Sequence, residues 1–220
     1  ATLFGAWTAT SASSNSGVAN LSSAGHAVDL SAASGTAGFS VTNTGGATSL
    51  VGSARGDTLI GGSGNDILTG GLGADTFVVD AGADSIKDLG NGADALQVSS
   101  GATSYATLFG AWTATSASSN SGVANLSSAG FAVDLSAASG TAGFSVLNTG
   151  AATSLVGSAR GDKLTGGSGD DTLTGGAGDD TLIGGAGADT LVVNAGADSI
   201  IALGNGADVL QVSSGATAHA

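Results

Sequence analysis

Large apolar side chains recur at a nine-residue interval through two long stretches of the chain. Each one follows an aspartate by two residues, and the last step of each series is ten residues long. The apolar series are Leu59, Leu68, Phe77, Ile86 and Leu96, and then Leu164, Leu173, Leu182, Leu191, Ile200 and Leu210. A six-residue turn followed by a three-residue strand with one inward side chain explains this interval. The pattern predicts an all-β parallel solenoid.

A looser form of the same pattern precedes each of these stretches. Leu21, Leu30, Val41 and Leu50 are spaced by nine, eleven and nine residues, and "HAVDLSAAS" and "AGFSVTN" alternate as strands do. We expect these parts to continue the solenoid without metal-binding turns. The stretches at 2–17 and 107–122 have no period and contain both tryptophans, so we interpret them as seams, for which a short helix and a strand are both open.

The chain consists of two tandem copies. Residues 1–57 reappear as 106–162 with three changes, and the second copy is longer by nine residues. The predicted first copy, 1–105, comprises a seam (1–21), metal-free coils (22–51) and glycine-aspartate repeats (52–97). The second, 106–219, has the corresponding parts at 106–126, 127–156 and 157–211. If two repeat units make one coil, the nine extra residues are half a coil, and we expect the two copies to leave the solenoid on opposite sides.

Composition narrows the class of protein. The 220 residues include 40 glycines and 4% aromatic residues, too few bulky side chains for a compact enzyme core. All 17 acidic residues are aspartate, against four basic residues, and there is no cysteine. The net charge of −13 argues against nucleic acid as a partner. No apolar stretch is long enough for a membrane span. With two histidines and no recurring Ser-His-Asp set, we expect no catalytic residues and no enzyme activity.

Five nine-residue segments share the pattern G-G-x-G-x-D-x-U-x, where U is a large apolar residue. They are "GGSGNDILT" (61–69), "GGLGADTFV" (70–78), "GGSGDDTLT" (166–174), "GGAGDDTLI" (175–183) and "GGAGADTLV" (184–192). The pattern resembles the RTX (repeats-in-toxin) haemolysin-type calcium-binding nonapeptide family. The resemblance implies a right-handed parallel β-roll with several bound Ca²⁺ ions, each held between one turn and the turn two repeat units further on.

Each residue type in the motif suits an oxygen cage. Glycine permits a sharp turn that aims carbonyl oxygens inward, and aspartate adds charged oxygens. These are the ligands that Ca²⁺ needs, since it takes six to eight oxygens at about 2.3–2.6 Å. The implied metal-site aspartates are Asp57, Asp66, Asp75, Asp84, Asp162, Asp171, Asp180, Asp189 and Asp198. The implied glycines are Gly62, Gly64, Gly71, Gly73, Gly167, Gly169, Gly176, Gly178, Gly185 and Gly187. Among the pairs of aspartates two repeat units apart, only Asp171 and Asp189 have a complete motif at both turns. We therefore expect the second copy to bind calcium more tightly than the first.

Calcium-coupled folding suggests a structural role outside the cell. Extracellular sites bind with Kd of about 10⁻⁴–10⁻³ M, so we expect the chain to fold after export. The RTX resemblance implies type I secretion as the export route. We predict a repeat unit of a secreted, self-associating protein, such as an adhesin, a surface layer or an extracellular filament. The alternative is the calcium-folded export domain of a secreted hydrolase or toxin. Expected partners are copies of the chain itself, with cell-surface glycan as a further candidate, and Phe4, Trp7, Phe109 and Trp112 are predicted assembly or capping residues.

Overall fold

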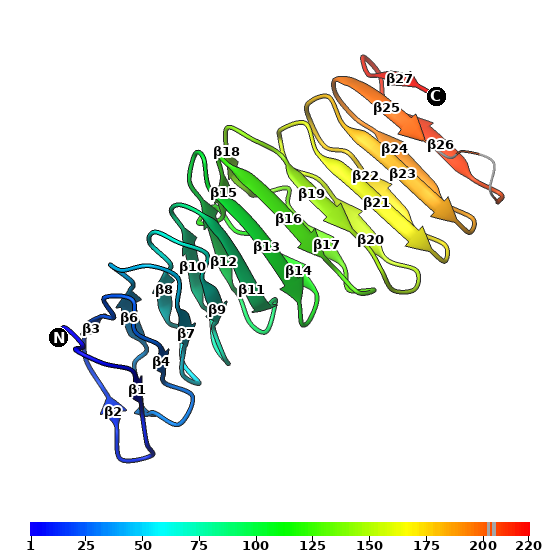
Figure 1. Ribbon diagram of the computed structural model, residues 1–220. Coiled ribbons are helices and arrows are strands. Elements are labelled where there is room, and N and C mark those ends of the chain that lie inside the picture. The colour runs from blue at the N-terminus through cyan, green and yellow to red at the C-terminus, as the bar shows by residue number, and fades with distance from the viewer. Residues whose placement is uncertain (202, 204–205) are drawn as a thin grey trace.

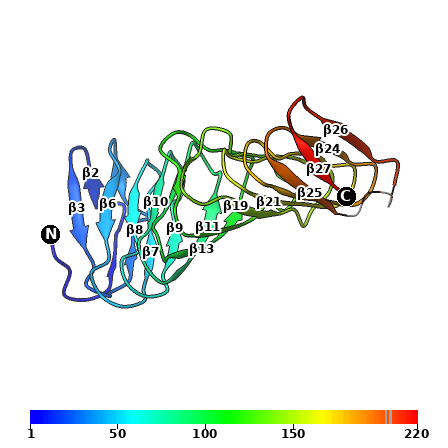
Figure 2. The same ribbon diagram turned by 90° about the horizontal axis from the view of Figure 1, so that it is seen from above.

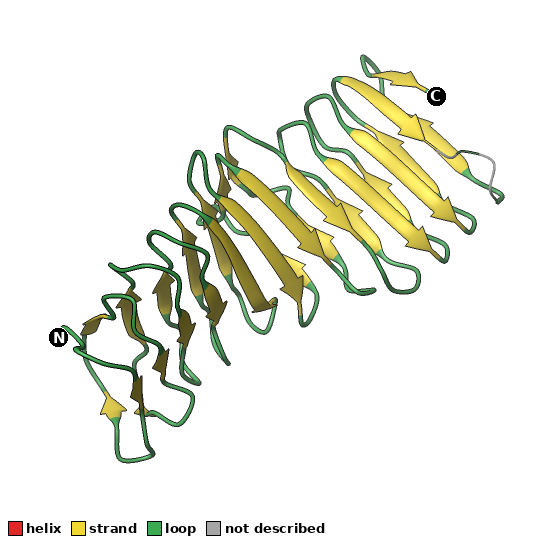
Figure 3. Ribbon diagram, in the orientation of Figure 1, coloured by secondary structure: helices red, strands yellow, loops and turns green. Residues whose placement is uncertain are grey.

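The structure is a computed structural model that describes residues 1–201, 203 and 206–220. It is a parallel β-solenoid of about 11 turns, as the apolar interval predicts, and its described part contains strands and turns without helix (Figures 1 and 3). The two termini lie at opposite ends of the stack (Figure 1). No helix in this part is long and apolar enough to cross a membrane.

Four parallel sheets form the sides of the solenoid. The 12-stranded sheet runs along the whole molecule and contains, in spatial order, β1 (Trp7–Thr8), β4 (Val28–Asp29), β7 (Ser49–Val51), β9 (Ile67–Thr69), β11 (Ala83–Leu89), β13 (Thr103–Leu108), β16 (Val123–Ser127), β19 (Phe144–Leu147), β21 (Lys163–Ser168), β23 (Thr181–Ala186), β25 (Ala197–Ile201) and β27 (Thr217–His219).

The other sheets complete the coils. The seven-stranded sheet contains β18 (Ser139–Gly140), β15 (Ser119–Asn120), β12 (Ala95–Val98), β10 (Thr76–Val79), β8 (Thr58–Ile60), β6 (Phe39–Thr42) and β3 (Ala19–Ser22). The six-stranded sheet contains β14 (Trp112–Thr113), β17 (Val133–Asp134), β20 (Ser154–Val156), β22 (Thr172–Thr174), β24 (Thr190–Val193) and β26 (Val209–Val212). A two-stranded sheet pairs β2 (Ser14–Asn15) with β5 (Ser34–Gly35).

Coils of two kinds alternate along the stack. In the glycine-aspartate stretches each coil has two strands, and its register advances by two repeat units, as in Thr58 beside Thr76. Strands β6, β8 and β10 lie across the coil from β7, β9 and β11 (Figure 2). In the upstream stretches a short third strand is added and the register advances by 20 to 22 residues, as in Thr103 beside Val123 and Val133 beside Leu155. The seams are therefore strands of the solenoid, and the stack continues through them.

Inward side chains form ladders along the core. In the 12-stranded sheet, ten successive inward residues are at most 4% exposed: Val28, Leu50, Leu68, Ile86, Ala106, Leu126, Val146, Leu164, Leu182 and Ile200. The residue two places after each repeat aspartate is buried as predicted, except Leu210 in the last coil, which is 37% exposed. Burial of these side chains is the main apolar contribution to stability, because few aromatic groups are present.

The extra nine residues change the side on which the second copy ends relative to its own start. The first copy begins with Thr2 beside Ser22, at the end of β3 in the seven-stranded sheet, and ends in β13 of the 12-stranded sheet. The second copy begins in β13 and ends in β27 of that same sheet. The first copy therefore ends on the side opposite its start, whereas the second copy ends on the side where it starts. Both exits lie on the 12-stranded sheet, so the expectation that the two copies leave the solenoid on opposite sides is wrong, because the first copy itself spans an extra half coil.

Removing one rung of a ladder should destabilise the calcium-loaded protein. Leu173 is fully buried between Leu155 and Leu191, so we expect Leu173→Ala to lower the free energy of unfolding by about 2–5 kcal/mol. Chemical denaturation in excess calcium measures the change. Thr172 lies on the same strand and is exposed, and Thr172→Ala should change stability by about 0.5 kcal/mol or less. Equal effects of the two substitutions would contradict the assigned inward face.

Candidate metal centres

The turns of the glycine-aspartate repeats have the backbone conformation that the motif predicts. All ten glycines expected at these turns have positive φ, from 75° at Gly62 to 135° at Gly187. At Gly64 (φ 110°) a side chain would be strained and would also contact the backbone of Ala47 in the preceding coil. Glycine therefore lets each turn bend sharply and lets successive turns stack closely.

The repeat aspartates stack into four rows, one aspartate per coil. In each row the backbone N–H of one aspartate donates to Oδ1 of the next, over 2.7–3.0 Å. The rows are Asp57–Asp75–Asp94, Asp66–Asp84, Asp162–Asp180–Asp198 and Asp171–Asp189–Asp208. Every pair that the motif places two repeat units apart is brought together. Asp94 and Asp208 extend two rows by a step that is one residue longer.

The second carboxylate oxygen, Oδ2, is buried and unbonded at six aspartates in the described part of the chain. They are Asp66, Asp84, Asp171, Asp180, Asp189 and Asp198. Asp57 and Asp162 differ, because Oδ2 of each accepts the backbone N–H and the hydroxyl of a serine four residues earlier, Ser53 and Ser158. A buried carboxylate oxygen without a donor is costly unless a cation meets it. The six oxygens therefore identify the strongest positions for a metal.

Oxygen atoms converge at the first glycine of a repeat. A Cβ placed on Gly61 would lie 2.4 Å from Asp84 Oδ2 and 3.2 Å from Asp66 Oδ2. A Cβ on Gly166 would lie 2.5 Å from the Gly184 carbonyl oxygen and 2.7 Å from Asp171 Oδ2. Each cradle joins a turn to the turn two repeat units later, and its donors are the carboxylate and carbonyl oxygens that Ca²⁺ prefers. No group of three or more His, Cys, Asp or Glu side chains surrounds a common point among the described residues, so carbonyls must supply part of each cage.

Comparison with known families agrees with this geometry. The family model of the RTX calcium-binding nonapeptide repeat matches residues 51–86, 156–191, 165–200 and 183–216. These are RTX calcium-binding nonapeptide repeats. Searches of curated proteins and of solved structures gave no significant match to the chain. RTX nonapeptide repeats bind calcium ions, and the proteins that carry them are typically secreted, which supports an extracellular location for this chain.

Most of the negative charge is inside the RTX stack. Eleven of the 17 aspartates are buried, namely Asp57, Asp66, Asp75, Asp84, Asp88, Asp94, Asp162, Asp171, Asp180, Asp189 and Asp198. The four basic side chains, Arg55, Lys87, Arg160 and Lys163, are all exposed. Bound calcium would supply the positive charge that the protein itself does not place among these carboxylates. The carboxylates and turn carbonyls of the RTX repeats would hold the ions between successive coils.

Burial raises the pKa of several repeat aspartates. Desolvation, with further repulsion from stacked carboxylates, raises the pKa of Asp75 and Asp180 to about 7. Desolvation likewise raises the pKa of Asp84 and Asp171 to about 6, partly opposed by backbone hydrogen bonds. At neutral pH a calcium-free row therefore carries carboxylates that resist ionisation, whereas a cation between them would favour the charged form.

Two asparagines belong to the RTX rows, although the motif does not mark them. Asn43 precedes the Asp66 row: its Nδ2 donates to Asp66 Oδ1 (3.2 Å) and to the Gly46 carbonyl (2.7 Å), and its Oδ1 accepts the Gly25 N–H (2.8 Å). Asn148 makes the corresponding contacts in the second copy, with the longest, to Asp171 Oδ1, at 3.5 Å. The only signal in the sequence is their recurrence at the same position of both copies. A neutral amide both donates and accepts, so it closes a turn without a metal.

Asp88 is a further buried carboxylate outside the motif. Its two oxygens accept the N–H groups of Gly70 (2.9 Å) and Gly71 (2.8 Å).

The sequence also contains Arg-Gly-Asp at 55–57 and 160–162, but Asp57 and Asp162 are only 2% and 3% exposed. Both lie in the RTX rows and cannot be presented to a receptor in the folded state.

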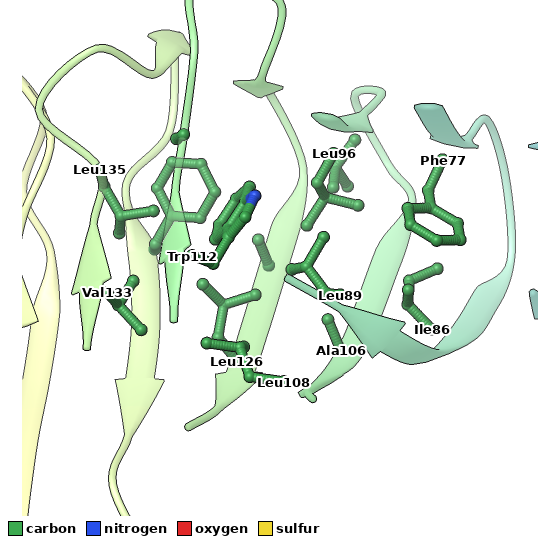
Figure 4. Packing of buried hydrophobic residues seen from close by; sticks show 14 of the residues in the cluster. Phe77, Ile86, Leu89, Leu96, Ala106, Leu108, Trp112, Leu126, Val133 and Leu135 are labelled. Atoms are coloured by element: carbon green, nitrogen blue, oxygen red, sulfur yellow. The ribbon is translucent and has the colours of Figure 1, made fainter. Parts of the chain in front are cut away.

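The four predicted assembly or capping aromatics differ in exposure. Trp112 is 1% exposed and lies in the core between Leu96 and Leu135 (Figure 4). Its counterpart Trp7 is partly buried in the first coil. Phe4 and Phe109 are exposed, at 95% and 66%. The structure thus makes Trp112 a core residue of the junction between copies and leaves the other three at the surface or partly covered.

Acid should stabilise the calcium-free chain and weaken calcium binding. The raised carboxyl pKa values mean that the folded state holds more protons than the unfolded state between about pH 4 and about pH 7, so calcium-free stability should rise as pH falls through this window. Protons and calcium compete for the same oxygens. Calcium titrations followed by circular dichroism at about pH 8 and about pH 5.5 should give a higher half-saturating concentration at the lower pH. An unchanged value would contradict the assigned ligands.

Substitution of matched aspartates should distinguish the two copies. Asp66 and Asp171 are the first aspartates of equivalent rows in the two copies. Four of the six unbonded Oδ2 atoms, however, belong to the second copy. We expect Asp171→Asn to raise the half-saturating calcium concentration more than Asp66→Asn does, in calorimetric titrations of the full chain. Asp134, which accepts a local N–H from Ser136 (2.9 Å) and lies outside the aspartate rows, provides a control with the same charge change. A larger effect from Asp66→Asn, or an equal effect from Asp134→Asn, would be inconsistent with tighter binding by the second copy.

Proposed function

We propose that this chain is a structural repeat section of a secreted, self-associating protein of the cell surface or extracellular space, such as an adhesin, a surface layer or a filament. The observation that carries the proposal is the 12-stranded sheet, which runs from β1 to β27 through both copies. Because the second copy continues the stack of the first, repeating the sequence lengthens one continuous rod. Such a rod is suited to spanning distance or building an array.

Calcium would control when this rod forms. Buried carboxylates repel one another without a cation, so the chain should remain unfolded where calcium is scarce and fold after export into a calcium-rich medium. In this proposal calcium binding supplies folding free energy and no catalysis. His26 and His219 are replaced by other residues at the equivalent positions of the other copy, Phe131 and Tyr105, which supports a role without enzyme activity.

The partners in this proposal are further copies of the chain, with cell-surface glycan as an additional ligand. A shallow groove on the outer face of the 12-stranded sheet is lined in part by Tyr105, Asn125 and Leu147. An exposed aromatic ring beside amide and hydroxyl groups is a suitable surface for a sugar. This groove supports the glycan as a candidate partner.

Electron microscopy of the chain with and without calcium tests the structural role. With excess calcium we expect rods that associate into longer assemblies, and with a chelator we expect neither. Sedimentation velocity on the same samples gives the mass distribution. Folded, calcium-loaded chains that stay monomeric at every concentration would instead favour the alternative, a calcium-folded export domain of a secreted hydrolase or toxin.

A further inference from the structure

Both lysines of the chain lie on one face of the solenoid. Lys87 is in β11 and Lys163 is in β21, and both side chains are exposed on the outer face of the 12-stranded sheet. Strands β13, β16 and β19 lie between them (Figure 1). Four strand spacings of about 4.8 Å place the two lysines roughly 19 Å apart along the stack. Neither ammonium group has a hydrogen bond or an ion pair within the part of the chain that the structure describes.

Acidic side chains are absent from the same face of the described strands. From β7 to β25 the strands of this sheet contain three aspartates, Asp84, Asp88 and Asp198, and all three are buried. The exposed Asp179 lies at the edge of the sheet, in the turn before β23, where its Oδ1 accepts the Ala197 N–H (2.8 Å). A chain with a net charge of −13 therefore presents one face with lysines and without carboxylates. This separation of charge favours an anionic partner.

The shallow groove over β13, β16 and β19 lies between the two lysines. Its lining includes the side chains of Tyr105 and Leu147, which are 55% and 47% exposed, and the polar side chains of Asn125 and Ser145. Tyr105 is paired with Asn125 on the next strand, Asn125 with Ser145, and Ser145 with Lys163. One row across four neighbouring strands therefore presents an aromatic ring, an amide, a hydroxyl and an ammonium group.

The residues that give this face its charge and its apolar contacts occur in only one of the two copies. Asn125 and Ser145 recur in the other copy as Asn20 and Ser40. The two lysines, the tyrosine and the leucine do not recur: the equivalents of Lys87, Tyr105, Leu147 and Lys163 are Ile201, His219, Thr42 and Thr58. The groove is therefore a single site in this chain, and the repeat itself does not explain it.

We propose that this face binds an acidic polysaccharide, whose carboxylate groups pair with Lys87 and Lys163 and whose sugar ring stacks on Tyr105. An aromatic ring offers an apolar surface to the C–H face of a sugar, and amide and hydroxyl groups exchange hydrogen bonds with its hydroxyls. Ammonium groups form charge-assisted hydrogen bonds with carboxylates. The inference rests on the glycan partner in the proposed function and specifies the charge of that glycan.

The shape of the site agrees with this occupant. The groove is open and shallow and crosses the strands, so a long chain of rings can lie along it and reach both lysines. Its polar row suits hydroxylated rings better than it suits a lipid acyl chain. Nucleic acid is a poorer fit, because two lysines neutralise few phosphates and the chain as a whole repels a polyanion of that charge density.

Titration with a hyaluronan oligosaccharide, whose alternate sugars carry a carboxylate, tests the proposal. The full chain and the ligand are dialysed against one calcium-containing buffer, so that free calcium is equal, and binding is measured by isothermal calorimetry. The same oligosaccharide with its carboxyl groups reduced to alcohols is the matched ligand. We expect the carboxylated form to bind about fivefold more tightly or better, and the difference to shrink as salt is added.

Variants of the face identify the groups responsible. Lys87→Gln and Lys163→Thr should each weaken binding of the carboxylated ligand by about two- to fivefold and leave the reduced ligand unaffected. Tyr105→Ala should weaken binding of both ligands by about three- to tenfold, whereas Tyr105→Phe keeps the ring and should keep the affinity. Arg55→Gln makes the same charge change in a turn outside this face and should leave binding unchanged. Circular dichroism in calcium checks that each variant is folded.

The outcomes separate this inference from the function on which it rests. If both ligands bind equally and the lysine variants bind as the unmodified chain does, the inference is wrong while a glycan partner stands. An effect of Arg55→Gln as large as that of the lysine variants would also overturn it. If neither ligand binds, the glycan partner fails too, and the calcium-dependent rod is left to electron microscopy. Displacement of the oligosaccharide by vesicles containing phosphatidylserine would identify a membrane surface instead and would contradict the proposal.

Discussion

The stacking of buried carboxylates is the constraint on which the rest of this structure depends. In the glycine-aspartate stretches each coil places an aspartate directly over the aspartate of the preceding coil, where one oxygen accepts a backbone N–H and the other is left without a donor at six positions. The apolar ladder alone is narrow, with one large inward side chain per strand in coils such as that of Leu173 and Leu182. Close packing of the coils with ionised carboxylates therefore needs a cation between the turns, which makes calcium part of the fold.

The same chain contains a second, metal-free way of closing a turn. In the upstream coils Asn43 and Asn148 fill the turn with an amide that donates and accepts, so the amide oxygen is already bonded to a backbone N–H. At the other end of the first row the indole of Trp112 donates to Asp94 where the next aspartate would otherwise follow. The aspartate rows are thus bounded by neutral groups, which divides each copy into metal-dependent and metal-independent coils while the sheet runs through both.

Much of this architecture could be predicted from the sequence because one physical period governs it. The nine-residue interval identified the inward ladder, and the glycine spacing identified the left-handed backbone positions. The three-stranded coils could not be predicted, since their added strands, such as Ser119–Asn120, are two residues long and have no hydrophobic alternation. The sequence also does not predict that Oδ2 is bonded at Asp57 and unbonded at Asp66, because this depends on the position of Ser53, which donates to Asp57 Oδ2. Such choices depend on three-dimensional contacts that spacing does not encode.

A calcium titration of the full chain at neutral pH, followed by far-UV circular dichroism, tests the central claim most directly. If calcium is required to keep the carboxylates together, the chain in excess chelator should lack the β-sheet signal, and the signal should appear cooperatively as calcium is added. A full β-sheet spectrum in chelator, unchanged by calcium, would show that the stacked carboxylates tolerate one another and would contradict the account.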